Sequence, residues 1–425
     1  MSFLSPYRAV LRTPYACGAF AASLVGRLCY GIVSLSLVLT LTAGGRGYGF
    51  AGLVMALFGA AVVLASPFRA WLVDRYGPRL ALPPMAAGFA AVLAAIAVIP
   101  ARAGAGEAAA AVLAAAAGAC APPLGVVMRS VWSALVEDRG LLQTAYSLDG
   151  VAEELLYVAG PVIAGVITVA AAPAIGLLVA AGLAVAGTGL FLRSPALGRQ
   201  RSAAASPPPR TPDPGPQGAG PGRAILAVAL ATGSIGLCLG GFGLVIVAFS
   251  QARHDPAAVA WMEAAMSAGS ALGGLGYGAV AWRTSARHRL VLLAAGLAVV
   301  LLPAALSPDL PVLALLAGGA GVLVSPALAT AYVLADSLAA PQARNRAGNW
   351  VNSGFNAGSA AGSVLSGQLI GRVPLSACLP VLAAPVLLAV LPLLRLRFAA
   401  AGQAPAAAGG FAGGAATSPA GAGDR

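Results

Sequence analysis

The chain has 425 residues, of which 59% are hydrophobic and only 9% are charged, and its mean hydropathy is +0.87. This composition supplies too little polar surface for a water-soluble globule of this size, so lipid must be the solvent for most of the fold. The net charge of +12 would suggest a nucleic-acid partner in a soluble protein, but here the basic residues, all arginine, lie at the ends of apolar segments, and no nucleic-acid partner is expected.

The apolar segments predict the fold class. An α-helix needs roughly 20 apolar residues to cross the hydrocarbon core of a bilayer, and about twelve segments reach that length. In chain order they are residues 14–43, 49–69, 80–100, 107–132, 143–169, 172–192, 224–249, 258–281, 290–306, 310–334, 346–371 and 374–394. We therefore predict an all-α membrane protein with about twelve transmembrane helices.

The arginines predict how these spans are oriented. With both termini in the cytoplasm, nineteen arginines, Arg69 among them, fall on the inner side. Those on the outer side are Arg46, Arg102, Arg253 and Arg372. This bias follows the positive-inside rule and supports an even number of crossings. The predicted location is the cell (inner or plasma) membrane, with the lipid bilayer around a multi-pass chain and both termini cytoplasmic.

A motif lies between the second and third spans, Ala70-Trp71-Leu72-Val73-Asp74-Arg75-Tyr76-Gly77-Pro78-Arg79. It resembles the signature loop of the major facilitator superfamily, Gly-x-x-x-Asp-Arg-x-Gly-Arg-Arg, although Ala70 replaces the first glycine and Pro78 replaces an arginine. Asp74 is positioned to cap a helix end and to pair with arginines, and Gly77 permits a tight turn. The resemblance implies a gating loop, with Asp74, Arg75, Gly77 and Arg79, that helps to latch two halves of the protein on the cytoplasmic side.

Ionisable residues inside the spans are the candidate functional residues, because a charge at bilayer depth needs a partner or a water-filled cavity. Arg27 lies near the middle of the first span and Arg129 towards the cytoplasmic end of the fourth. Asp149, Glu153 and Glu154 lie in the inner half of the fifth span. Asp149 and Glu153 are four residues apart, so they share a helix face and their titrations are expected to be coupled.

This acidic cluster predicts a proton-coupling device. Arg129 in the first place, or Arg27 as the alternative, would pair with the cluster and release it during a transport cycle. A permanently paired structural ion network is the competing interpretation. Tyr157, which follows on the same span, is expected to form an aromatic wall of a central cavity.

The proline-rich segment near the middle of the chain divides it into halves. Residues 194–223 contain eight prolines together with glycine, serine and arginine, a composition that does not form a packed core and predicts a cytoplasmic linker. The predicted six-helix bundles are residues 1–193 and 224–397, and residues 398–425 are predicted to be a disordered tail. The major facilitator resemblance therefore covers nearly the whole chain and implies two pseudo-symmetric bundles.

The eleventh span carries two stripes. The polar stripe consists of Asn345, Asn349, Asn352, Asn356, Ser359 and Ser363. Asparagines that faced lipid would be penalised, so this stripe should face either the central cavity or another helix, and Asn349, Asn352 and Asn356 are candidate substrate-binding residues. The second stripe, Gly354, Gly358 and Gly362, predicts close contact with a neighbouring helix.

These features favour a secondary active transporter that works by alternating access around a site near the middle of the membrane. The resemblance favours proton-coupled export of a small amphipathic or hydrophobic organic molecule, and Gly160-Pro161 resembles a fragment of the Gly-Pro motif of antiporters. The alternative is proton-coupled import of a carboxylate or amino-acid-like nutrient, with Arg27 binding the carboxylate.

A polytopic membrane enzyme or sensor is the remote alternative. Membrane enzymes need clustered catalytic or metal-binding residues, whereas His254 and His288 lie in separate loops and the five cysteines are scattered singly. Without a lysine the chain contains no P-loop. We expect a monomer that is not an enzyme and has no metal or cofactor, with a small molecule and protons as its partners.

Overall fold

The computed structural model describes residues 5–45, 48–98, 105–198, 221–255, 258–304, 306–340, 343–370 and 372–395. Of the predicted linker, only residues 194–198 and 221–223 are described. Residues 396–425, which include the predicted tail, lie outside the described residues. The described part of the chain is almost entirely helical and contains fourteen helices.

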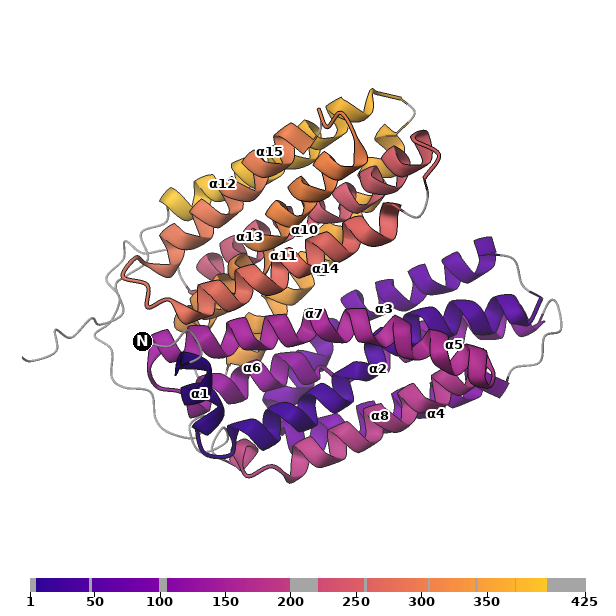
Figure 1. The fold of residues 1–425 in the computed structure, drawn as a ribbon. Helices are drawn as coiled ribbons and strands as arrows, with labels where there is room; N and C mark the ends of the chain where they lie inside the picture. Colours follow the sequence, from indigo (N-terminus) through magenta and orange to yellow (C-terminus); the bar gives the residue numbers. More distant parts are fainter. Residues whose placement is uncertain are drawn as a thin grey trace, which may run out of the picture.

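One bundle is built from the first half of the chain (Figure 1, indigo to magenta). Its helices are α1 (Ser5–Arg12), α2 (Ala16–Ala43), α3 (Tyr48–Tyr76), α4 (Pro78–Val98), α5 (Ala105–Cys120), α6 (Leu124–Leu135), α7 (Arg139–Ala170) and α8 (Pro173–Arg193). Helix α2 packs against α7 and α8, α3 packs against α5, and α4 packs against α5 and α8.

The other bundle is built from the second half (Figure 1, pink to yellow). Its helices are α10 (Pro221–Ala252), α11 (Ala258–Ala279), α12 (Ala286–Ala304), α13 (Leu310–Leu338), α14 (Arg344–Leu369) and α15 (Leu375–Arg395). Helix α10 packs against α14 and α15, α11 against α13, and α12 against α13 and α15.

The twelve predicted spans correspond to these helices, with α5 and α6 together forming the fourth span. That span is interrupted at Ala121-Pro122-Pro123, because proline lacks the N–H donor that a continuous helix requires. Ten helical segments of the described chain are long and apolar enough to cross a membrane, and α11 and α14 complete the twelve. The protein is an all-α membrane protein with two six-helix bundles.

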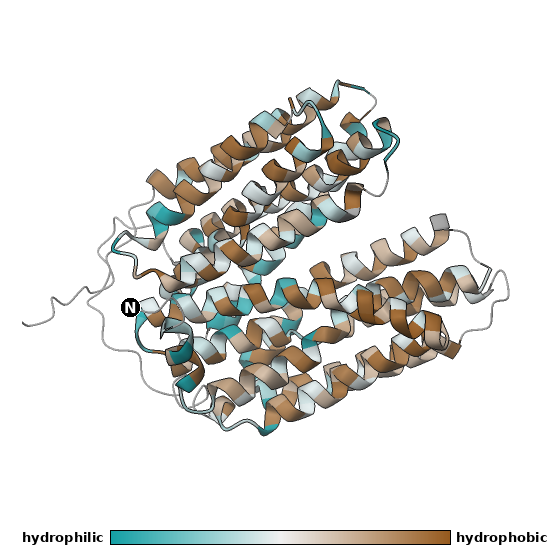
Figure 2. Ribbon diagram, viewed as in Figure 1, coloured by the Kyte–Doolittle hydropathy of each residue, from teal (hydrophilic) through white to brown (hydrophobic). Residues whose placement is uncertain are grey.

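The surface of the bundles fits a lipid environment. Figure 2 shows hydrophobic residues along most of each helix, whereas hydrophilic residues gather at the loops and in the interior. Large apolar side chains such as Leu64, Val98 and Leu315 are 79%, 76% and 76% exposed. In water such exposure would be costly, but in a bilayer the same side chains face hydrocarbon.

The second span is longer than predicted. Helix α3 continues to Tyr76, so Asp74 and Arg75 lie on its last turn and not in a loop. The chain turns at Gly77, whose φ of +80° lies in the left-handed region that favours glycine, and its N–H donates to the carbonyl of Val73 at 2.8 Å. The predicted tight turn at Gly77 is present in the structure.

The glycine stripe of α14 packs directly against α10, as predicted. A Cβ atom added to Gly358 would lie 1.9 Å from the carbonyl oxygen of Gly233, and one added to Gly362 would lie 1.9 Å from that of Leu237. Real Cβ atoms essentially never approach so closely, so only glycine allows the two backbones to touch here.

We expect Gly358→Ala to lower the free energy of unfolding by about 1–3 kcal/mol, because the methyl group would force the α10 backbone away from α14. Gly165→Ala is the matched control, since no atom lies within 4 Å of the Cβ position at Gly165. Denaturant unfolding of the purified protein in detergent measures both values. Equal stability of the two variants would contradict the close packing.

The two bundles contact each other at the end of the molecule that carries α1, the last turn of α3 and the start of α10, which we call the termini end. There the Tyr7 hydroxyl donates to the carbonyl of Leu275, and the Thr144 hydroxyl donates to the carbonyl of Gly278 at 2.5 Å. Towards the opposite end the bundles diverge in Figure 1. The side chain of Val169, at the far end of α7, is 91% exposed.

Candidate functional site

A central cavity of about 750 Å³ lies between the first bundle and α14. This volume is within the range of about 300–1,000 Å³ that is typical of small-molecule sites. The residues predicted for the site that line it are Arg27, Arg129, Glu153, Tyr157, Asn349, Asn352 and Asn356. The structure therefore brings residues from both halves of the sequence to one cavity.

Arg27 and Arg129 form a closed ion network with Asp149 and Glu153. Arg27 Nη1 lies 2.7 Å from Asp149 Oδ1, and its Nη2 lies 3.0 Å from Glu153 Oε2. Arg129 Nε lies 3.0 Å from Asp149 Oδ2, and its Nη2 also contacts Glu153 Oε2. Both arginines therefore pair with both carboxylates, whereas the sequence suggested one arginine in preference to the other.

The backbone explains how these four groups come together. Asp149 and Glu153 are one turn apart on α7. Gly125, in the first turn of α6, has no side chain and so leaves room for the arginines. A Cβ at Gly125 would lie 3.5 Å from Arg27 Cζ and 3.7 Å from Arg129 Nη1. Asp149 is fully buried, whereas the side chain of Glu153 is 30% exposed and lines the cavity.

The network also reaches the second bundle. The guanidinium carbon of Arg129 lies 4.1 Å from the ring centre of Tyr332 on α13, close enough for a cation–π contact. The Tyr332 hydroxyl in turn donates to Asn352 Oδ1 at 3.4 Å. A movement of the second bundle would therefore change the surroundings of Arg129.

The sequence left open whether the asparagines of α14 contact another helix or face the central cavity, and both environments occur. Asn349 is 2% exposed and accepts a hydrogen bond from the hydroxyl of Ser66 on α3, while the Ser353 hydroxyl donates to Ser66 Oγ at 3.0 Å. Asn356 is exposed within the cavity wall, and its amide donates to the Asn352 carbonyl at 2.8 Å. Sequence reasoning missed Ser66, and no spacing in the sequence distinguishes it from other small residues.

Arg69 is also part of the cavity, which corrects its expected place on the cytoplasmic side. Arg69 belongs to α3, seven residues before the end of that helix, and is 5% exposed. Its Nη2 donates to the carbonyl of Val62 at 2.6 Å, and its Nη1 donates to the carbonyls of Gly118, at 3.3 Å, and Ala121. Val62 lies on α3 itself, Gly118 on the last turn of α5 and Ala121 in the break before α6. The proline pair that follows Ala121 is therefore a sequence signal for one of these acceptors.

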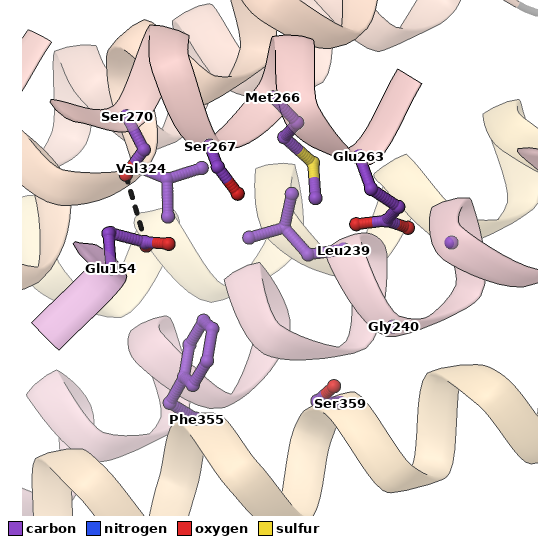
Figure 3. A pocket seen from close by; sticks show the side chains of 11 residues that line it. Glu154, Leu239, Gly240, Glu263, Met266, Ser267, Ser270, Val324, Phe355 and Ser359 are labelled. Carbon is purple, nitrogen blue, oxygen red and sulfur yellow. Dashed lines mark hydrogen bonds between the residues drawn. The ribbon is translucent and has the colours of Figure 1, made fainter. Parts of the chain in front are cut away.

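Glu154 lies outside the ion network. It accepts a hydrogen bond from the Ser270 hydroxyl of α11 at 3.2 Å. With Glu263 it lines a second cavity of about 300 Å³ between the bundles. Figure 3 shows both carboxylates at the wall of this cavity, with Leu239 and Met266 between them. Neither carboxylate forms an ion pair with an arginine of the described chain.

The motif at the end of α3 connects the bundles at the termini end. Asp74 Oδ2 lies 3.2 Å from Arg346 Nε of α14, and the Asp74 side chain is 8% exposed. Arg75 and Arg79 are exposed on the surface of the same end. The contact therefore joins the two halves of the chain at the termini end.

We expect Asp74→Asn to favour opening at the termini end by about 1 kcal/mol or less, since half-exposed ion pairs contribute little. Ser147→Cys, buried under α11 in this closed arrangement, would report opening through its alkylation rate in a cysteine-free background. The rate should rise by up to about fivefold. Arg372→Gln at the opposite end is the control, and equal rates in all backgrounds would contradict a latch.

Comparisons with solved structures show which fold this is. The human organic anion transporter MFSD10 (TETRAN) is similar, with a TM-score of 0.69 and 18% identity over 89% of this chain and 99% of that chain. The proton:xylose symporter XylE of the major facilitator superfamily, bound to 6-bromo-6-deoxy-D-glucose, has a TM-score of 0.64 and 11% identity over 89% of this chain and 94% of that chain. No protein-family model and no curated protein sequence matches the chain.

Proposed function

The chain has the fold of the major facilitator transporters, and from that premise we propose that it is a secondary active transporter of a small organic molecule. The observation that carries the proposal is the central cavity between two bundles that touch at one end and diverge at the other. Rocking the bundles about this cavity would expose it alternately to the two sides of the membrane. We propose that the protein works as a monomer.

The proposed direction is export. The arginine bias supports a cytoplasmic location for the termini end, and with that orientation the arrangement described here would be the outward-facing state of the cycle. Export in exchange for protons then requires release of the substrate from this state and entry of a proton. Import of a nutrient with protons is the second candidate, and the name of XylE as a proton symporter gives it support.

The cavity suits an amphipathic molecule. Met55, Phe58 and Val62 of α3 form an apolar part of its wall, whereas Asn352 and Asn356 of α14 supply amides. An apolar ring or chain would gain from leaving water at the first surface, and polar groups would be hydrogen-bonded at the second.

Two sets of carboxylates are candidates for the proton site. In the ion network, Asp149 and Glu153 are each paired with both Arg27 and Arg129, so the network would have to open before either carboxylate could exchange a proton. Glu154 and Glu263 face a cavity between the bundles without an arginine partner in the described chain. We infer that Glu154 carries the proton and that Glu153, which lines the central cavity, senses the substrate.

Proton movement in inside-out vesicles tests the proposal. Hydrophobic cations, neutral aromatic compounds and carboxylates would be added in turn, with a fluorescent pH indicator on each side of the membrane. An exporter coupled to protons should release protons from the acidified lumen when a substrate is added. Ligand-driven proton movement in the opposite direction would favour import, and transport without any proton movement would contradict proton coupling.

A further inference from the structure

We propose that the central cavity binds the negatively charged group of its substrate, a carboxylate or sulfonate, at an anion site formed by Arg69 and the first turn of α6. The inference rests on the proposed function in that it names the charge class of the molecule in that cavity. Equilibrium binding tests it without any transport, so the two proposals can fail separately.

The charge of Arg69 has no counter-charge among the described residues. No carboxylate of the described chain lies within 4.0 Å of its guanidinium, and the side chain is 5% exposed. Asp149 and Glu153 neutralise Arg27 and Arg129, which leaves Arg69 as a surplus positive charge at the cavity wall. A buried charge without a partner is unfavourable, and an anionic ligand would supply that partner.

The guanidinium of Arg69 is fixed in place but not saturated. Its two terminal nitrogens donate to the carbonyls of Val62, Gly118 and Ala121, whereas Nε is buried and has no hydrogen-bond partner in the described chain. A guanidinium binds a carboxylate best along an edge, through two parallel N–H groups. Nε is therefore a donor left to be paired, which an anion beside the side chain would satisfy, and the carbonyls hold the guanidinium in position without neutralising it.

The start of α6 adds to the positive potential. This helix of 12 residues begins at Leu124, and its N-cap residue Pro123 provides no side-chain cap. Gly125 and Val126, in the first turn, line the same cavity as Arg69. The first N–H groups of a helix and its dipole favour an anion, and here the helix begins at the depth of the cavity instead of at the membrane surface.

Arg69 and this helix start are adjacent. The carbonyl that Arg69 contacts at Ala121 precedes the first residue of α6 by three positions. The apolar wall of Met55, Phe58 and Val62 belongs to the same cavity, so the favoured ligand combines an apolar ring or chain with one anionic group. A small inorganic anion would leave that apolar wall without a contact.

Binding of four probes with the same ring tests the site: 2-naphthoate, naphthalene-2-sulfonate, neutral 2-naphthamide and cationic 2-naphthylmethylammonium. Calorimetry on the purified full-length protein in detergent gives the affinity for each probe. We expect at least one of the two anions to bind about tenfold or more tightly than the amide, and more weakly as salt is added. Preference for the amide or the cation, or no binding of either anion at millimolar concentration, would overturn the proposal.

Substitution of Arg69 then locates the site. Arg69→Gln should weaken the binding of the anions by about tenfold or more and leave that of the amide unchanged. Arg69→Lys should retain more of the preference for anions, because it retains the charge. The control is Arg253→Gln, since Arg253 also donates to a backbone carbonyl but is exposed outside the cavity.

Unchanged anion affinity in Arg69→Gln would overturn the proposal, and so would equal losses for the anions and the amide. If Arg69→Gln fails to fold, the charge series on the unmodified protein and Arg69→Lys decides the result. Anion binding without any transport would leave this site intact and contradict the proposed function. Transport of neutral or cationic compounds without a preference for anions would support the proposed function and contradict the anion site.

Discussion

Replacing Asp149 with asparagine is expected to destabilise the folded protein by about 3–5 kcal/mol. Asp149 is fully buried and contacts Arg27 at 2.7 Å and Arg129 at 3.0 Å. The substitution is nearly isosteric, so the loss would come from the charge: two buried guanidiniums would share the single carboxylate of Glu153. Denaturant unfolding of the purified protein in detergent measures the change.

The matched control for Asp149→Asn is Glu137→Gln, which removes one negative charge from an exposed position and should change stability by no more than about 0.5 kcal/mol. Arg129→Gln combined with Asp149→Asn restores the charge balance, and we expect part of the lost stability to return. A change below about 1 kcal/mol in Asp149→Asn would contradict a tightly paired network.

Glu154→Gln is expected to abolish ligand-driven proton movement while the protein still binds its ligand. Glu154 faces the cavity shared with Glu263 and accepts a hydrogen bond from Ser270, a bond that the glutamine carbonyl can also accept. Glutamine keeps the size and the hydrogen bond but cannot take up or release a proton. The number of protons moved per transported molecule, measured in inside-out vesicles, should therefore fall by about tenfold or more.

Glu153→Gln distinguishes the two acidic sites. Because Glu153 lines the central cavity and contacts both arginines, its loss should alter ligand affinity more than proton flux. Unchanged proton movement in Glu154→Gln together with its loss in Glu153→Gln would transfer the coupling role to the ion network.

The sequence predicted the helices well, because their signals are local. Apolar length determined the twelve spans, and the four-residue recurrence of Gly354, Gly358 and Gly362 predicted the contact that α14 makes with α10. Gly77 marked the turn after α3 for an equally local reason, since glycine adopts a positive φ at little cost.

The candidate site was predicted only in part, because its details depend on three-dimensional contacts. Arg69 was assigned to the membrane surface, where arginines usually end a span, but carbonyls at the break between α5 and α6 allow it to lie deeper. Glu153 and Glu154 are neighbours in sequence, yet successive residues of an α-helix point about 100° apart. Both line a small cavity beside Tyr332, but only Glu153 also reaches the central cavity and only Glu154 the cavity that contains Glu263, and the position of α11 shows what Glu154 contacts.

We propose that the two bundles rock about the central cavity and so expose it to each side of the membrane in turn. Spin-label distances across the two ends of the bundles measure this movement. In a cysteine-free background, labels at positions 76 and 282 would report the termini end, and labels at 169 and 306 would report the opposite end; Tyr76, Trp282, Val169 and Leu306 are all exposed. We expect that lowering the pH or adding the naphthalene probes lengthens the first distance while shortening the second. Distances that stay fixed at both ends under every condition, or that change together, would contradict it.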